Sequence, residues 1–319
     1  MSASRGRSSE TSLRLCSRAP RMMSWSVTDV LVGPRGGQVG GVEHMFASTA
    51  PAVKPTHRST FSRGTHTAPI VHPRGWVPQR WHDGPVTDSA ARAADLITDA
   101  DRALVRTVDR LDEAAYAEPS LLPGWTRAHV VAHLALNAEG LAGVLHGAHI
   151  GEPQPMYASP EGRDSDIAEL AASDCSELRE RLLAGTATFS DALAAMHEND
   201  WAGRFERTPG GPDFALAHVA LMRVREVEIH HADLGAGYSP VDWPEPFRVL
   251  LLDSMTKRPY PAPFSVHPTD LDRTWHYGEG TGGAVVTGTS ADLGWWLTGR
   301  GTGEGLESDT NDLPEVESW

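Results

Sequence analysis

The stretch FALAHVALMRVREVEIHHADL, residues 214–234, is the one on which the fold prediction rests. It contains no glycine or proline, and its apolar residues recur every three or four positions, which predicts a helix. On that helix Glu226 and His230 leave the same face, about one turn apart. Such a pair is often only a solvated ion pair, but it can also bind a divalent metal. Zinc takes about four ligands, so a metal site would need a third residue from elsewhere in the chain.

A second helical stretch supplies histidines for that role. In GWTRAHVVAHLALNA, residues 124–138, His129 and His133 are four apart on one face. Helical bundles build metal sites from inward-facing carboxylates and histidines on different helices. Either His129 or His133 could therefore complete a three-ligand site with Glu226 and His230, leaving a fourth position open. The alternative is that each histidine is an ordinary hydrogen-bonded residue of the core.

The helical periods predict a mainly α fold whose N-terminal part is an up-and-down four-helix bundle over residues 86–237. The first helix begins near Thr87 and ends before Pro119, and the second is capped by Thr126. A Gly- and Pro-rich loop over about residues 147–162 separates the second helix from the third. The third carries Leu178, Leu182, Phe189, Leu193 and Met196, and the opening stretch is the fourth.

Beyond Tyr238 the composition changes, and residues 238–319 are predicted to form a small α+β domain. Three prolines mark its beginning. The expected elements are a helix over Phe247–Met255, strands over Thr274–Tyr277 and Ala284–Thr287, a helix over Ala291–Leu297 and a Gly-rich exit.

Charged residues are distributed unevenly along the 319-residue chain. Residues 1–85 carry 11 basic and 4 acidic side chains, a net charge of +7, whereas residues 86–319 carry 17 and 38, a net of −21. The first segment has no sustained helical or strand period and is interpreted as a disordered extension or a misannotated start, with a functional arm as the alternative. The acidic remainder argues against nucleic acid as a partner.

Cysteine usage and hydropathy indicate the compartment. Cys16 and Cys175 form no metal spacing, and a disulfide between them is not expected. No apolar run approaches a membrane span, and no secretory signal follows the early arginines. We therefore expect a cytoplasmic protein, monomeric or homodimeric, that does not bind membranes.

The two helix motifs, GWTRAHVVAHLALNA (residues 124–138) and MRVREVEIHHADLG (residues 222–235), resemble those of the mycothiol-dependent maleylpyruvate isomerases, whose N-terminal half is a DinB-like four-helix bundle. The resemblance runs from about Asp88 to the C-terminus. It includes the loop PMYASPEGRDSDIA (residues 155–168) and the late motif VVTGTSADLGWWLTGRG (residues 285–301), which narrow the match to the isomerase itself. Residues 1–85 lie outside it.

The resemblance implies a metal, expected to be zinc, held by His133, Glu226 and His230. It also implies that Arg300 is catalytic and binds the cofactor mycothiol or the substrate through a carboxylate; a plain ion pair is the alternative. The resemblance gives no ligand role to five other residues inside the motifs: His129, Arg223, Arg225, His231 and Asp233. Asp233 could orient His230, and a helix-end capping or solvated role is the alternative.

The implied reaction is the cis-to-trans isomerisation of maleylpyruvate to fumarylpyruvate. A thiolate of mycothiol adds to the double bond, rotation follows, and the thiolate leaves; zinc would stabilise that thiolate. The natural substrate site would be a cleft between the bundle and the C-terminal domain. Two alternatives remain open: another mycothiol-dependent transferase or detoxification enzyme on the same scaffold, and a non-catalytic metal-binding protein.

Overall fold

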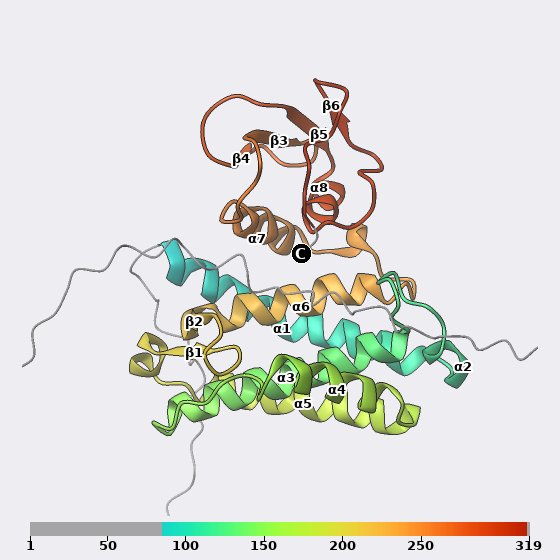
Figure 1. Cartoon of the computed structure of the whole chain (residues 1–319), viewed down its shortest axis with the longest axis vertical. Coiled ribbons are helices and arrows are strands. Elements are labelled where there is room, and N and C mark those ends of the chain that lie inside the picture. Colours follow the sequence, from blue (N-terminus) through green and yellow to red (C-terminus); the bar gives the residue numbers. More distant parts are fainter. Residues whose placement is uncertain (1–84, 318–319) are drawn as a thin grey trace, which may run out of the picture.

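The computed structural model describes residues 85–317. The interpretation of residues 1–85 falls outside this range except for Pro85, which begins the first helix. A layer of long helices carries a smaller part with a sheet at its C-terminal end (Figure 1). The predicted mainly helical fold with a small sheet region is confirmed. The division of the chain at residue 237 stays a prediction.

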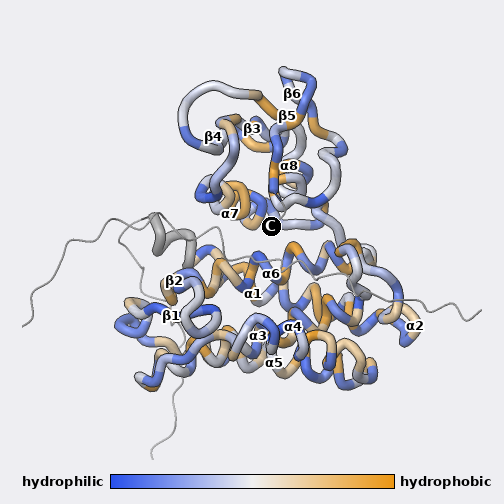
Figure 2. Tube along the Cα trace, viewed as in Figure 1, coloured by the Kyte–Doolittle hydropathy of each residue, from blue (hydrophilic) through white to orange (hydrophobic). Residues whose placement is uncertain are grey.

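Four helices form the bundle: α1 (Pro85–Arg110), α3 (Arg127–His149), α5 (Cys175–Ala195) and α6 (Val219–Asp233). Helix α3 packs against α5 and α6, and α1 packs against α6 and α5. In Figure 2 apolar and polar residues are interspersed along these helices. The first predicted helix is shorter than expected, because a separate short helix α2 (Glu113–Tyr116) precedes Pro119.

The sequence prediction missed helix α4 (Pro160–Ala171), which lies between α3 and α5 and packs on α3. Its start has the ordinary signals: the Ser159 side chain accepts a hydrogen bond from the Gly162 N–H, and Pro160 occupies the first turn. The loop predicted over about residues 147–162 overlaps only the first turn of α4, and no separate helix was predicted before the one that carries Leu178. Helix α4 matters because it brings Arg163 to the buried face of α3.

Helix α3 is the central helix of the bundle. The sequence prediction that no apolar run approaches a membrane span is wrong for this helix: by length and composition α3 could span a membrane, but 72% of its apolar window is buried inside the fold. Its buried residues lie all around the helix, because α4, α5 and α6 cover different sides. A helix that is hydrophobic all round is typical of a protein core. The expected cytoplasmic location stays a prediction.

A buried arginine joins the bundle helices. Arg223 on α6 is fully buried and donates hydrogen bonds to Asp101 on α1 (2.9 Å) and Asn137 on α3 (3.0 Å). Its guanidinium also lies 5.8 Å from the centre of the Phe189 ring on α5. This one side chain therefore contacts all four bundle helices, and it fixes the rotation of α6 about its axis.

The connection from α5 to α6, residues 196–218, is long and irregular. It contains the 3-10 helices η2 (Glu198–Ala202) and η3 (Leu216–His218) and a two-stranded antiparallel sheet of β1 (Arg204–Glu206) and β2 (Asp213–Ala215). Phe214 therefore lies in β2, and the fourth bundle helix begins later than the sequence pattern predicts. The Phe214 side chain packs against Phe205, with ring centroids 5.8 Å apart.

The C-terminal part begins with η4 (Pro240–Asp242) and α7 (Glu245–Met255), which fits the predicted helix. Its sheet has the order β4-β3-β5-β6, with β3 antiparallel to β4, parallel to β5, and β5 antiparallel to β6. The strands are β3 (Phe264–Pro268), β4 (Trp275–Tyr277), β5 (Val285–Gly288) and β6 (Glu307–Ser308), and α8 (Ser290–Leu297) follows β5. Strands β4 and β5 and helix α8 lie where expected; β3 and β6 were missed.

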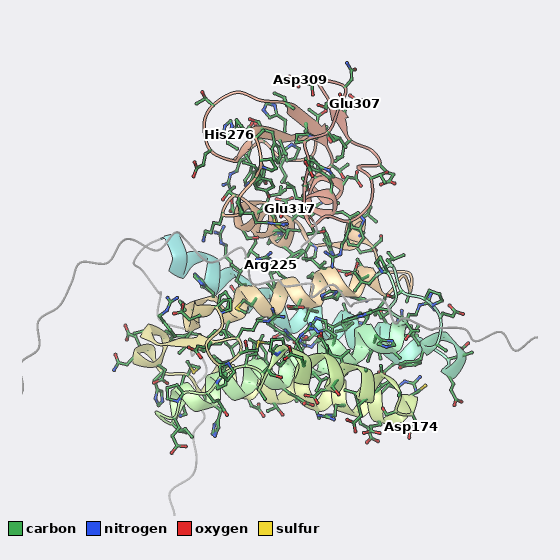
Figure 3. All side chains as sticks on the ribbon, in the orientation of Figure 1. Asp174, Arg225, His276, Glu307, Asp309 and Glu317 are labelled. Atoms are coloured by element: carbon green, nitrogen blue, oxygen red, sulfur yellow. The ribbon has the colours of Figure 1, made fainter. Side chains whose placement is uncertain are left out.

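Helix α6 faces both the bundle and the C-terminal part. Figure 3 shows Arg225 on the side of α6 towards the C-terminal part. The side chain is fully buried, and burial lowers its pKa to about 9, although Glu226 partly offsets this. Every residue of α6 is buried, so the helix is enclosed on all sides.

Asp270 links the start of α8 to α7. It accepts hydrogen bonds from the Ser290 backbone N–H and hydroxyl, both at 2.7 Å, and from Arg248 at 3.1 Å. Burial would raise its pKa, but the hydrogen bonds from Ser290, its own backbone N–H and the charge of Arg248 together outweigh burial and lower the pKa. The stabilisation is therefore present above the unfolded-state pKa of about 4 and is lost as the pH falls below it.

We expect Asp270→Asn to lower the free energy of unfolding by about 1–2 kcal/mol at pH 7, because a charged acceptor is lost. The difference from the unaltered protein should shrink as the pH falls below about 4. Urea unfolding at several pH values measures both effects. Asp272→Asn, at an exposed position two residues away, is the matched control and should change little. A constant difference across pH would contradict this assignment.

Candidate metal centre

His133 on α3 meets Glu226 and His230 on α6 inside the bundle. The Nε2 atom of His133 lies 2.8 Å from Oε2 of Glu226, and the Nε2 atom of His230 lies 3.2 Å from the same oxygen. The two imidazole rings are perpendicular, with centroids 4.7 Å apart. One candidate ligand atom from each residue lies within 4.8 Å of the others. The structure therefore brings together the three residues that the resemblance selects.

Charge in this cluster is buried and must be balanced. Burial would raise the pKa of Glu226, but the two histidines hold it well below its usual range, so the carboxylate is ionised. Burial lowers the pKa of His133 to about 4, which leaves that imidazole neutral. Burial also disfavours charge on His230, but hydrogen bonds to Asp233 and Glu226 raise its pKa. The two carboxylates thus favour a positive charge, a proton or a metal ion, between Glu226 and His230.

The donor set fits a divalent metal. Nδ1 of His230 lies 2.8 Å from Asp233 Oδ2 and donates to that carboxylate, so the Nε2 lone pair points at Glu226 Oε2. Two acceptors facing each other at 3.2 Å need a cation between them, either a proton or a metal ion. Two imidazoles and one carboxylate are ligands that zinc takes, and three protein ligands leave one position open.

Asp233 continues the chain of contacts to the C-terminal part. Arg300 donates from Nε at 2.9 Å and from Nη2 at 2.8 Å to the two oxygens of Asp233, and from Nη1 to the Thr298 carbonyl at 3.1 Å. Both side chains are almost fully buried. Burial would raise the pKa of Asp233, but Arg300 and His230 lower it, so it stays ionised. Arg300, on the loop after α8, therefore supports the orientation of His230 through Asp233.

Arg163 on α4 approaches the cluster from the opposite side. Its Nη2 lies 3.3 Å from Nδ1 of His133, its Nη1 donates to Asp164 at 2.8 Å, and its guanidinium lies 5.7 Å from the Tyr157 ring centre. A guanidinium only donates, so His133 accepts at Nδ1 and carries its hydrogen on Nε2, towards Glu226. The resemblance gave Arg163 no role, although it lies in the quoted loop.

The remaining motif residues have structural roles. His129 does not join the cluster: its Nδ1 lies 2.7 Å from the Thr126 hydroxyl in the capping box that begins α3. His231 contacts the Thr107 hydroxyl at 2.7 Å and stacks on Tyr238 at 3.7 Å. Between the two histidines that the sequence left open, the structure thus places His133 at Glu226.

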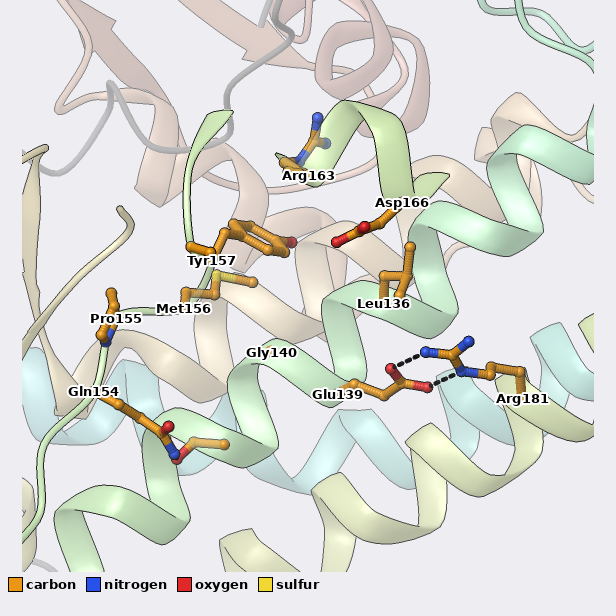
Figure 4. Close-up of a pocket in the computed structure, with 12 residues that line it drawn as sticks. Leu136, Glu139, Gly140, Gln154, Pro155, Met156, Tyr157, Arg163, Asp166 and Arg181 are labelled. Atoms are coloured by element: carbon orange, nitrogen blue, oxygen red, sulfur yellow. Dashed lines mark hydrogen bonds and ion pairs between the residues drawn. The ribbon is translucent and has the colours of Figure 1, made fainter. Parts of the chain in front are cut away.

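A pocket of about 340 Å³ lies beside the cluster, between α3, α4 and the loop before α4 (Figure 4). Arg163 belongs both to its lining and to the contacts of His133. Glu139 and Arg181 form a two-point ion pair at 2.7 and 2.9 Å on its wall. Other lining residues are Leu136, Gly140, Met156 and Tyr157. The pocket lies within the bundle; the expected cleft between bundle and C-terminal domain stays a prediction.

Fold and site together define a class: a DinB-like helical bundle with an inward-facing His–Glu–His cluster, followed by a small sheet part. The protein-family model described as the mycothiol maleylpyruvate isomerase N-terminal domain matches residues 97–235 of this chain. The crystal structure of the mycothiol-dependent maleylpyruvate isomerase matches with 30% identity and a TM-score of 0.64, covering 76% of this chain and all of that one. A histidine-to-alanine mutant of that enzyme matches with 30% identity, a TM-score of 0.63 and the same coverage.

Among curated proteins none matches the chain significantly. The similarity to the solved structures is nevertheless sufficient in identity and coverage, and the chain belongs to the mycothiol-dependent maleylpyruvate isomerase family.

We expect Arg300→Gln to destabilise the protein by about 3–5 kcal/mol, because it leaves the Asp233 carboxylate buried without its main counter-charge. In Asp233→Asn/Arg300→Gln part of the loss should return, and a double-mutant cycle by urea unfolding should give a coupling above about 1 kcal/mol. Arg273→Gln removes an exposed ion pair with Asp253 in the same part of the chain and should cost no more than about 1 kcal/mol. Equal losses in Arg300→Gln and Arg273→Gln would refute the buried coupling.

Proposed function

We propose that this protein catalyses the mycothiol-dependent, metal-assisted isomerisation of maleylpyruvate to fumarylpyruvate. The observation that carries the proposal is the convergence of His133, Glu226 and His230 on one buried point in a chain of this family. We further propose that these three residues hold a divalent metal, with zinc favoured by the two imidazoles and one carboxylate. Mycothiol and the keto-acid substrate would be its small-molecule partners.

The reaction needs a nucleophile that can be lost again. A mycothiol thiolate forms a C–S bond to the substrate double bond, whose electron pair moves to the conjugated carbonyl. The remaining single bond rotates, the electron pair returns, and the C–S bond breaks to release the thiolate. Nothing is oxidised or reduced. A bound metal would supply the positive charge that favours thiolate over thiol, whose free pKa is about 8.5.

The residues around the cluster would prepare it for this chemistry. Glu226 brings a fixed negative charge to the buried point, and neutral His133 can present its Nε2 lone pair there once its hydrogen moves to Nδ1. Asp233 holds His230 in the orientation that presents Nε2, and Arg300 holds Asp233. Such outer contacts commonly change metal affinity or activity 10- to 100-fold. No cysteine of the chain is needed, because the thiol comes from mycothiol.

Two arginines are candidates for binding a substrate or mycothiol carboxylate. The assignment of Arg300 to that role stays a prediction, but its donors already serve Asp233 and Thr298, which favours a positioning role. Arg163 is the better placed cation, because it lines the pocket beside the cluster. If Nε2 of His133 binds a metal, the ring hydrogen moves to Nδ1. Arg163 can then no longer donate to Nδ1, which leaves the Arg163 N–H group available for an anion.

The first test follows the absorbance of maleylpyruvate with the purified protein, with and without mycothiol, before and after chelation. We expect turnover only when thiol and metal are both present. His133→Ala should remove one tightly bound zinc and the turnover while the helical circular dichroism stays largely unchanged, because a ligand is lost from an otherwise packed bundle.

Three outcomes of this test would count against parts of the proposal. Turnover without mycothiol would refute its thiol dependence. Unchanged tightly bound zinc in His133→Ala would refute the ligand assignment. No turnover in a protein that retains one tight zinc would favour another mycothiol-dependent transferase or detoxification enzyme instead.

The second test separates the arginines. We expect Arg163→Gln to raise KM for maleylpyruvate about tenfold or more, because a charged hydrogen bond to a carboxylate is worth about 1.5–3 kcal/mol. Arg163→Lys should recover part of the loss. Arg181→Gln is the control. Arg181 lines the same pocket but is already paired with Glu139, so this change should leave KM within about twofold. An unchanged KM in Arg163→Gln would exclude this role.

A further inference from the structure

A second group of potential metal ligands lies at the other end of the bundle. His149 is in the last turn of α3, His197 directly precedes η2, and Asp200 lies within η2. His149 follows His133 by sixteen residues along α3, which places the two about 24 Å apart along the helix axis. This second group is therefore separate from the cluster of His133, Glu226 and His230.

The two imidazoles converge on one carboxylate oxygen. Nδ1 of His149 lies 3.0 Å from Asp200 Oδ2, and Nδ1 of His197 lies 4.0 Å from the same atom. The rings are 4.8 Å apart and inclined by 65°. Tetrahedral zinc with bonds of about 2.0–2.2 Å keeps neighbouring ligand atoms about 3.3–3.6 Å apart. The two nitrogen–oxygen distances, 3.0 Å and 4.0 Å, lie just below and just above that range, so both histidine rings would have to shift slightly to bind one ion.

A simpler explanation accounts for only part of this arrangement. Asp200 Oδ2 accepts the His197 backbone N–H at 2.8 Å and so caps η2. The capping box also engages the His197 side chain with the Asp200 backbone N–H, so capping explains the position of His197 but not why His149 adjoins the same carboxylate oxygen. The carboxylate is held in place by the cap and by α3, with 17% of its side chain exposed, while His197 is 78% exposed. The group is thus partly preformed and open to ions from solvent.

We propose that His149, His197 and Asp200 form a second, solvent-facing site for a divalent transition-metal ion of the zinc class, with water completing the coordination. Imidazole ligands favour zinc, nickel or copper over magnesium and calcium. A metal here would join the end of α3 to the connection after α5, so it would stabilise the fold without taking part in the proposed reaction.

The test uses the full chain without any polyhistidine tag, freed of metal by chelation and titrated with Zn²⁺ alone in a calorimeter. We expect one equivalent of Zn²⁺ to bind tightly, at the His133 cluster, and a second equivalent to bind more weakly, at the second site. His197→Ala should lose the weaker one, or weaken it at least tenfold, and His133→Ala should lose the tight one. His146→Ala, an exposed histidine one turn before His149, is the matched control and should retain both. In His133→Ala the melting temperature should still rise with zinc.

The outcomes separate this inference from the proposed function. A weaker equivalent that persists unchanged in both His197→Ala and Asp200→Asn would overturn the second site and leave the His133 cluster unaffected. The second site would also be refuted if the unaltered protein binds a single zinc that His133→Ala removes. Loss of the tight equivalent only, with the weaker one retained in His133→Ala, would support both assignments.

Discussion

The guanidinium of Arg223 is the constraint on which the bundle depends. It is fully buried, pairs with Asp101, bonds Asn137 and lies against Phe189, so each of the other three bundle helices presents a partner to it. Removing one partner would leave a buried charge uncompensated, which is among the costliest changes that a core can suffer. The helices are therefore held in one relative rotation, because other rotations would separate this charge from its partners.

That rotation also places the candidate metal centre. Arg223, Glu226, His230 and Asp233 follow one another at spacings of three, four and three residues and form a single stripe along α6. Along the antiparallel α3, Asn137 meets Arg223 and His133 meets Glu226. The same register that satisfies the buried arginine thus brings His133 to Glu226, and structural and chemical residues share one interface.

Local sequence patterns predicted much of the fold and part of the candidate metal centre. The periodicity of residues 214–234 and 124–138 predicted the two helices that bear the cluster, and the i, i+4 spacing placed Glu226 beside His230. Periodicity could not choose between His129 and His133, since both lie on one face; the choice depends on where α3 begins and how α6 packs. The contacts of Arg163 with His133 and of Arg300 with Asp233 join residues 30 and 67 positions apart, and no local pattern encodes such distances. Strands β3 and β6 were missed because short strands depend on their neighbours.

The Asp233–Arg300 contact makes the docking of the C-terminal part and the state of His230 a single equilibrium. Thermodynamic linkage is reciprocal: whatever fixes His230 in its present tautomer also tightens the hold on the loop after α8, and by the same free energy. Conversely, an event that pulls Arg300 away withdraws the charge that keeps Asp233 ionised and His230 oriented. The attachment of the C-terminal part is thus coupled energetically to the orientation of His230, through Asp233, which lies 67 residues before Arg300 in the chain.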